Sequence, residues 1–103
     1  MMTSMITRVF RVRVPKALHK EFEKQFINLS IPTVKAYKGL ITVTVGRPTR
    51  WAPEEYVMIS LWDNEQAVRD FAGEQWNQAV IPEGMEKYVA ECWVHHYEMF
   101  GYP

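Results

Sequence analysis

The segment EYVMISLWD, residues 55–63, constrains the fold of this 103-residue chain more than any other segment. Successive side chains of a β-strand point to opposite faces of the sheet. Both alternating sets of this segment are largely apolar: one holds Val57, Ile59 and Leu61, and the other holds Tyr56, Met58, Ser60 and Trp62. A strand that is apolar on both faces is typical of a sheet interior. The segment therefore predicts a central strand that is covered on both sides.

Three more strands and two helices are predicted around this segment. Residues 5–14, 40–48 and 92–100 are rich in β-branched or aromatic residues and favour strands. Leu18, Phe22, Phe26 and Leu29 recur at spacings of four, four and three, which indicates one face of a helix that Pro32 should kink or end. Residues 64–72 predict a second helix, with Asp63 as its N-cap and Gln66 completing a capping box.

The resulting order, β-α-β-β-α-β, predicts an α+β fold of the ferredoxin-like type in one domain, residues 1–103. Its four-stranded antiparallel sheet would have the first and third strands at the centre and both helices on one face. The other face would still carry apolar side chains from the third strand, and leaving them in water is unfavourable. We therefore expect a second copy of the chain to cover that face in a homodimer.

Composition and charge exclude several classes of protein. Twelve basic residues balance twelve acidic ones without a basic stripe, so we expect no nucleic-acid partner. No apolar run reaches the ~20 residues that cross a bilayer, and the first residues lack the pattern of a signal peptide, so we expect no membrane association. The single cysteine, Cys92, cannot form an intrachain disulfide and favours a cytoplasmic location.

The passage YVMISLWDNEQAVRDFAGEQW, with GLITVTVGRP before it and WVHHYEMF after it, resembles the antibiotic biosynthesis monooxygenase family of the dimeric α/β-barrel superfamily. The similarity rests on Leu61-Trp62-Asp63 at the end of a strand, on residues 64–67 as the helix cap, and on Phe71 within the helix. The resemblance implies the dimeric barrel fold. It also implies several functions, because the family includes cofactor-independent oxygenases of aromatic polyketides or quinols, haem-degrading enzymes and proteins without known activity.

The haem-degrading branch can be tested residue by residue. Its members carry an Asn on the first strand, a Trp on the second helix and a haem-ligating His ten residues after that Trp. The first strand here, residues 6–14, contains no Asn, Phe71 stands at the Trp position, and Ile81 stands at the His position beside Pro82. The sequence therefore argues against haem degradation. No His, Cys or carboxylate cluster has the spacing of metal ligands, so we expect neither a metal nor a cofactor.

His95 and His96 stand side by side on the fourth predicted strand, so they should point to opposite faces and cannot share one metal. One histidine would pack on the sheet or lie near solvent or the dimer seam, and alternatively one would line the pocket between helices and sheet as a base or donor. His95 shares its face with Trp93, Tyr97 and Met99. We prefer His95 as the pocket residue on that ground.

The remaining candidates are aromatic or basic. Trp62, His95 and Tyr97 are the predicted catalytic residues, and Arg47, Phe71 and Trp76 are the predicted substrate-binding residues. Trp62 and Trp76 would otherwise serve as packing residues, although a buried indole N–H needs a partner. Arg47 would meet an anionic substrate oxygen or form a salt bridge with Glu54 or Glu55. Arg11 and Arg13 would reach the dimer rim, or one of them would enter the pocket.

Two functions of different classes follow. The first is a cofactor-independent monooxygenase of a small phenol or quinol, since a deprotonated phenol can pass electrons to oxygen directly and the protein then supplies an apolar pocket and a donor for the anion. The second is a non-catalytic protein of the same fold that binds a small hydrophobic ligand or none. A lactone isomerase is a third possibility, and fold similarity alone does not decide among the three.

Overall fold

The computed structural model describes residues 4–101. The strands are β1 (Ile6–Arg13), β2 (Leu40–Gly46), β3 (Glu55–Trp62) and β4 (Glu91–Glu98). The helical elements are η1 (Lys16–Leu18), α1 (His19–Gln25), η2 (Phe26–Ser30), α2 (Ile31–Lys35), α3 (Glu65–Ala72) and η3 (Glu86–Tyr88). All strand pairs are antiparallel in the order β2-β3-β1-β4, so β1 and β3 are central. The predicted ferredoxin-like α+β fold is confirmed.

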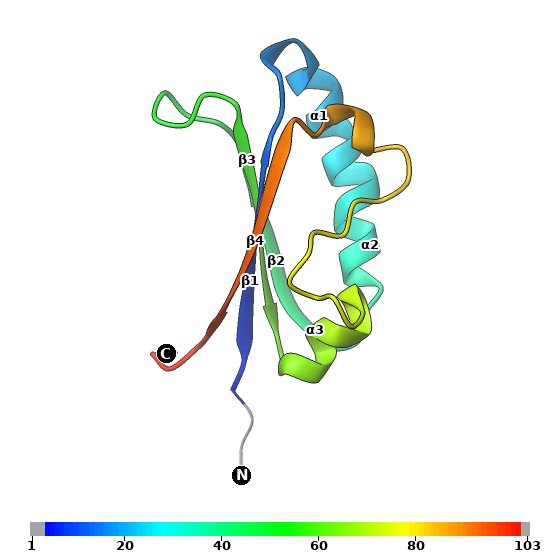
Figure 1. Cartoon of the computed structure of the whole chain (residues 1–103), viewed down its shortest axis with the longest axis vertical. Coiled ribbons are helices and arrows are strands. Elements are labelled where there is room, and N and C mark those ends of the chain that lie inside the picture. Colours follow the sequence, from blue (N-terminus) through cyan, green and yellow to red (C-terminus); the bar gives the residue numbers. More distant parts are fainter. Residues whose placement is uncertain (1–3, 102–103) are drawn as a thin grey trace.

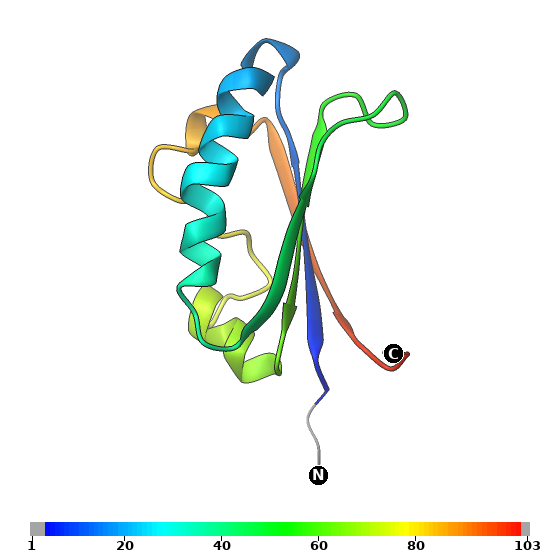
Figure 2. The same cartoon turned by 180° about the vertical axis from the view of Figure 1, so that it is seen from behind.

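All helices lie on one side of the sheet, as the two views in Figure 1 and Figure 2 show. We call this side of the sheet the helix face. The opposite side, which we call the open face, is covered by no element of residues 4–101 (Figure 1). The open face carries Thr7, Val9 and Arg11 of β1 and Val57, Ile59 and Leu61 of β3.

Strand pairing decides which apolar set of β3 meets the helices. Tyr56, Met58 and Trp62 are buried on the helix face, where Tyr56 and Met58 stand opposite Val12 and Phe10 of β1. Ile59 on the open face is 41% exposed. The sequence alone left both assignments possible because each set is apolar. β1 resolves the choice, because its apolar residues Phe10 and Val12 face the core and stand opposite Met58 and Tyr56 of β3.

Pro32 does not end the first helix, although an end at Pro32 was one of the two alternatives that the sequence left open. Helical backbone continues from α1 through η2, a π-helical segment, into α2, where Pro32 lies in the first turn. Proline has no N–H, and a π-helical segment shifts the hydrogen-bond register just before that missing donor. The hydroxyl of Thr33 also donates to the carbonyl oxygen of Leu29 at 2.8 Å, which satisfies a group near the break.

Two sequence-based assignments are wrong: the N-cap of the second long helix, and the side of the sheet to which Ile41 points. The N-cap of α3 is Asn64, not Asp63, because the Asn64 side chain accepts from the N–H of Ala67 at 2.9 Å. Asp63 instead donates its N–H to the carbonyl of Gly39. In β2, a register shift between Leu40 and Thr42 leaves Ile41 39% exposed, so Ile41 does not share the buried side of Val43 as its parity suggested.

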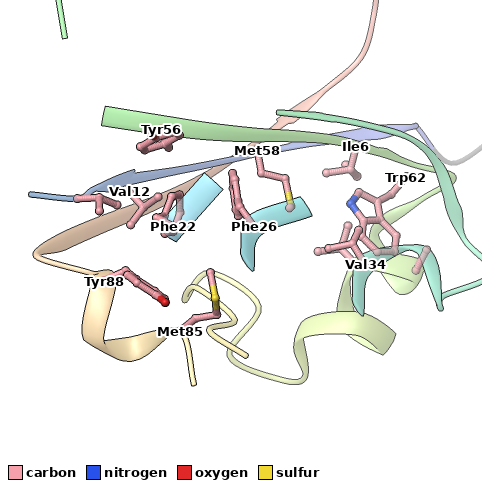
Figure 3. Close-up of a cluster of buried hydrophobic side chains, with 13 residues drawn as sticks. Ile6, Val12, Phe22, Phe26, Val34, Tyr56, Met58, Trp62, Met85 and Tyr88 are labelled. Carbon is pink, nitrogen blue, oxygen red and sulfur yellow. The ribbon is translucent and has the colours of Figure 1, made fainter. Parts of the chain in front are cut away.

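Two buried tyrosines join the helices to the core shown in Figure 3. Tyr56 of β3 donates its hydroxyl to Glu23 at 2.7 Å, and Tyr88 of η3 donates to Glu21 at 2.8 Å. Both acceptors lie on α1, and Phe22 between them packs on both tyrosine rings. Each buried hydroxyl therefore has a partner, which removes the cost of burying it unpaired. The bond from Tyr56 fixes α1 against the sheet. Phe22 and Phe26 then form part of the wall of a cavity between this helix and the sheet.

Candidate functional site

A cavity lies between the helix face of the sheet and the segments that cover it. Its walls are mostly apolar and include Phe10, Phe26, Met58, Met85 and Ile81. The space open to the centre of a water molecule is about 40 Å³. One water needs about 10–15 Å³ of such space, so the cavity holds several waters or one aromatic ring in their place. Met58, Phe26 and Met85 lie near one another in this region of Figure 3.

Arg8 of β1 is the one charged side chain among the described residues that line this cavity. The residue is 3% exposed. Its Nη1 donates to the carbonyl of Trp76 at 2.7 Å and to Nε2 of His96 at 2.9 Å, and its Nη2 donates to the carbonyl of Gln78 at 3.0 Å. The guanidinium also lies 5.4 Å from the centre of the Phe71 ring. Arg8 therefore holds the segment after α3 and borders the cavity at the same time.

The charge of Arg8 has no acidic partner. None of the ion pairs formed within residues 4–101 includes Arg8. Burial lowers the pKa of Arg8 to about 10, because the charged form loses hydration and gains no opposite charge. The guanidinium remains protonated at neutral pH. The cavity thus contains a buried positive charge that only neutral groups surround, and such a charge favours binding of an anion.

His96 stands beside Arg8 as its neutral neighbour. The guanidinium has only donors, so Nε2 of His96 accepts and the ring carries its proton on Nδ1. Burial, and next the positive charge of Arg8, lower the pKa of His96 to about 4. The ring also meets Trp76 edge to face at 4.5 Å. His96 is therefore neutral across the physiological range.

Ser60 and Trp62 form a second polar pair on β3. The indole N–H of Trp62 donates to Oγ of Ser60 at 2.9 Å, and Ser60 lines the cavity. Trp62 itself is fully buried and stacks on Phe71 at 5.2 Å. Ser60, Arg8 and His96 stand opposite one another in the strand register, so they form one polar row across an apolar face. The Ser60 hydroxyl accepts from Trp62 and keeps its own hydrogen for a ligand.

The histidine pair alternates as predicted, but the preferred member is wrong. His95 stands opposite Val9 on the open face and is exposed, whereas His96 stands opposite Arg8 on the helix face. Tyr97 shares the open face and is 53% exposed. Neither His95 nor Tyr97 reaches the cavity, because the parity of β4 relative to β1 turns them away. The aromatic neighbours that favoured His95 belong to the open face.

The three predicted substrate-binding residues do not lie together in the structure. Phe71 lines the cavity, and its contact with a substrate stays a prediction. Trp76 meets Arg8 through its backbone carbonyl and His96 through its ring. Arg47 lies elsewhere: it pairs with Glu23 at 2.9 Å, not with Glu54 or Glu55, and borders a separate, more open hollow beside Tyr56. Arg11 and Arg13 lie on the open side, where they pair with Glu55 and with Glu54 and Glu91.

Sequence reasoning missed Arg8, although a signal was present. Arg8 has the parity of Ile6, Phe10 and Val12, which are the apolar residues of the first strand. A charged residue inside a buried set is more informative than Arg11 or Arg13 on the other parity.

For metals, no group of three His, Cys, Asp or Glu side chains in the described part of the chain could hold an ion.

Comparison with known proteins supports the fold and the family. At 20% identity, a putative antibiotic biosynthesis monooxygenase from Caulobacter crescentus matches with a TM-score of 0.76 over 96% of this chain and 92% of that one. SnoaB, a cofactor-independent oxygenase from Streptomyces nogalater, matches at 19% identity with a TM-score of 0.71 over 94% of each chain. A haem-degrading protein from Mycobacterium tuberculosis matches at 20% identity with a TM-score of 0.66 over 93% of this chain and 91% of that one.

These identities are low, so the solved structures establish the fold alone. Among curated proteins, none has a sequence that matches this chain. The family model described as antibiotic biosynthesis monooxygenase matches residues 5–83, which include β1, the cavity residues of β3 and all of α3. The chain therefore belongs to the antibiotic biosynthesis monooxygenase family.

Proposed function

We propose that the protein is a cofactor-independent monooxygenase that acts on a small phenol or quinol in the cavity beside Arg8. The observation that carries the proposal is the combination of apolar walls with one buried positive charge and, beside it on the sheet, the Ser60 hydroxyl. Family membership supports the same reaction class, and the fold neighbour SnoaB is a cofactor-independent oxygenase.

The chemistry requires a phenolate in a dry site. A phenolate is electron-rich enough to pass an electron to O₂, and the two radicals then combine at a ring carbon that carries hydrogen, which is opposite the oxygen in a phenol and next to a C–O carbon in a quinol. Loss of water from the hydroperoxide gives the quinone, so one atom of O₂ enters the ring and the other leaves as water. All electrons come from the substrate. Arg8 would stabilise the phenolate, Ser60 would donate to it, and the apolar walls would exclude water.

A non-catalytic ligand-binding protein is the second candidate, and one observation favours it. Among the described residues that line the cavity, none is a carboxylate or an imidazole that could remove the phenol proton. His96 is near, but its Nε2 accepts from Arg8. The oxygenase therefore depends on a substrate acidic enough to bind as its anion, since no general base stands in contact with it.

The three residues that the sequence predicts as catalytic have different roles in this proposal. Trp62 would act through Ser60, because its N–H already donates to the Ser60 hydroxyl. Trp62 is then a positioning residue. His95 and Tyr97 face away from the cavity, so we assign no chemical step to them.

We further propose that the protein is a homodimer joined through the open face. Val9, Ile59 and the ring of Trp93 give this face apolar surface, and Arg11 lies over Trp93 at 5.7 Å. Ile59 and Tyr97 remain substantially exposed in the single chain, and a second sheet would cover them.

None of the helices in residues 4–101 has the length and apolar character needed to span a bilayer. The free Cys92 fits the cytoplasmic location that we propose.

Oxygen uptake tests the proposed reaction. The protein would be mixed with quinols, naphthols and anthrones in turn, and oxygen consumption and quinone formation would be followed together. We expect one substrate class to consume one O₂ per quinone formed without added metal or flavin. An Arg50→Met variant, changed on the exposed β2–β3 loop, should keep the full rate. If no member of the panel consumes oxygen above the protein-free rate, the binding function is favoured instead.

A further inference from the structure

We propose that Arg8 makes the cavity selective for a small aromatic anion, whose charged oxygen meets the guanidinium and whose ring fills the apolar space. The ligand class is a single aromatic ring that carries a phenolate or a carboxylate. This inference rests on the cavity of the proposed function being a ligand site, but it does not require that the ligand be oxidised.

The hydrogen bonds of Arg8 leave part of its binding capacity unused. A guanidinium carries five N–H groups in a fixed planar fork. Contacts to Trp76, His96 and Gln78 use three of them: both on Nη1 and one on Nη2. These three contacts leave two N–H groups, Nε–H and the second N–H of Nη2, without an acceptor among the described residues. Arginine binds planar oxyanions through two such neighbouring donors.

A purely structural role explains only half of the arrangement. Bonds to the carbonyls of Trp76 and Gln78 would hold the segment after α3, and a neutral side chain could serve that purpose. The burial of a full positive charge without an opposite charge is left unexplained, because such a charge is costly when it is not compensated. A bound anion would supply the missing partner. Uncompensated charges of this kind are characteristic of ligand sites.

The rest of the cavity defines the other end of the ligand. Its walls beyond Arg8 and Ser60 are formed mainly by Phe, Met, Val and Ile side chains, among them Phe10, Met58 and Ile81. The open space of about 40 Å³ fits one ring. Phe71 contacts the guanidinium and also lines the cavity, so it borders both the charged and the apolar region. A ligand with one charge at one end matches this division, whereas an inorganic anion would leave the apolar part empty.

A colour change in 4-nitrophenol gives a direct test, because its anion absorbs visible light and its neutral form does not. We expect binding to the wild-type protein to lower the pKa of 4-nitrophenol by about one unit, a tenfold preference for the anion. The shift should vanish in Arg8→Met. Arg8→Lys, which keeps the charge but not the fork, should retain part of it. Arg50→Met, which removes a guanidinium from an exposed loop, should retain all of it.

A second measurement needs no variant. Calorimetric titration of the wild-type protein should show benzoate binding at least about tenfold more tightly than benzamide, which has a similar shape but no charge. Binding of nitrophenolate without benzoate identifies a ring oxyanion as the ligand, and the reverse identifies a carboxylate.

The inference and the proposed reaction fail in different ways. If benzoate or nitrophenolate binds in an Arg8-dependent manner while no phenol consumes oxygen, the anion site stands and the oxygenase fails. If phenols are oxidised equally by the wild-type protein and Arg8→Met, the oxygenase stands and the anion site fails. The inference is overturned directly if the wild-type protein binds benzoate no more tightly than benzamide and also leaves the pKa of 4-nitrophenol unchanged.

Discussion

Arg8 connects the polar residues of the helix face: its guanidinium contacts Nε2 of His96, and Ser60 stands opposite it in the strand register. Trp62 joins this group by donating to Ser60. Arg8 provides the charge, and the other three are neutral groups that hold it or stand beside it. An apolar sheet face interrupted by one polar row is unfavourable for packing, since every buried polar group needs a partner. Such a departure from the buried pattern is expected where a protein binds something.

The His96 ring should make stability depend on pH. Its pKa is lowered to about 4 in the folded chain and would be near 6.5 when unfolded. The unfolded chain therefore binds more protons between these values, and stability falls as the pH drops from about 6.5 to about 4. Because His96 is only partly buried, we expect a loss of about 1 kcal/mol.

Urea unfolding at several pH values measures this effect. The slope over that window should flatten in His96→Gln, which keeps an acceptor for Arg8 but cannot gain a proton. His95→Gln, changed on the exposed face of the same strand, should keep the wild-type slope. Equal slopes in the wild-type protein and His96→Gln would show that another group is responsible.

Replacement of Trp62 tests whether it positions Ser60. Trp62→Phe keeps the ring that stacks on Phe71 but removes the donor to Ser60. We expect unfolding to become easier by about 1–2 kcal/mol, less than the roughly 3–5 kcal/mol of a change to Ala. Nitrophenolate affinity should fall about two- to tenfold, the range of one hydrogen bond.

A double-mutant cycle separates the two residues. If Trp62 acts through Ser60, the pair Trp62→Phe and Ser60→Ala should weaken nitrophenolate binding no more than Ser60→Ala alone. Additive losses would mean that Trp62 contacts the ligand independently.

At the scale of elements, the strands and helices could be predicted, but their exact fit could not. Alternation and helical spacing are local properties, and they identified all four strands, α1 and α3. The π-helical passage around Pro32, the bulge at Ile41 and the cap at Asn64 depend on contacts that alternation does not encode. The N–H of Asp63, for example, pairs with the carbonyl of Gly39, and the side chain that caps α3 is that of the next residue, Asn64.

Gly39 marks the closest approach between the start of β2 and α3. A Cβ at this position would overlap the Cβ of Ala67. We therefore expect Gly39→Ala to lower the free energy of unfolding by about 2–3 kcal/mol, because α3 would have to move. Chemical denaturation measures the change.

Ala67→Gly provides the matched test of this contact. Alone it should cost about 1 kcal/mol, since glycine weakens a helix. Combined with Gly39→Ala it should recover part of the loss, because the overlapping atom is gone. Gly101→Ala, where nothing lies within 4 Å, should change stability by less than about 0.5 kcal/mol. No recovery in the double variant would disprove steric overlap as the cause.

For the molecule as a whole, the fold was predictable and the site was only partly so. The order of elements determines the sheet, but both sets of β3 are apolar, so the open face could not be named from β3 alone. His95 was preferred over His96 for the helix face because its neighbours of the same parity on β4 are apolar or aromatic, and these neighbours lie on the open face. Phe71, which the family resemblance singled out, lines the cavity, whereas its predicted contact with a substrate stays a prediction. Arg8 lay on the buried parity of β1 and could have been recognised there.

The proposed dimer is tested by placing a charge on the open face. Ile59 is central on that face and 41% exposed, so Ile59→Lys would bury an unpaired charge in a sheet-to-sheet interface. Sedimentation at micromolar concentration should give twice the 12.2 kDa of the chain for the wild-type protein and a single chain for the variant. Ile27→Lys, changed at an exposed position on the helices, should remain dimeric. A wild-type protein that sediments only as one chain would disprove the dimer.

The central claim is that the cavity beside Arg8 is the ligand site, and nuclear magnetic resonance of the arginine side chains tests it most directly. Benzoate and, in a separate titration, 4-nitrophenolate would be added to the ¹⁵N-labelled protein while the Nε–H signals of the arginines are followed. We predict that the Arg8 signal moves and saturates at one ligand per chain, while those of the surface residues Arg11 and Arg50 stay in place. A saturable shift at Arg11 or Arg50 with an unmoved Arg8 signal, or no saturable shift with either benzoate or 4-nitrophenolate, would contradict the account.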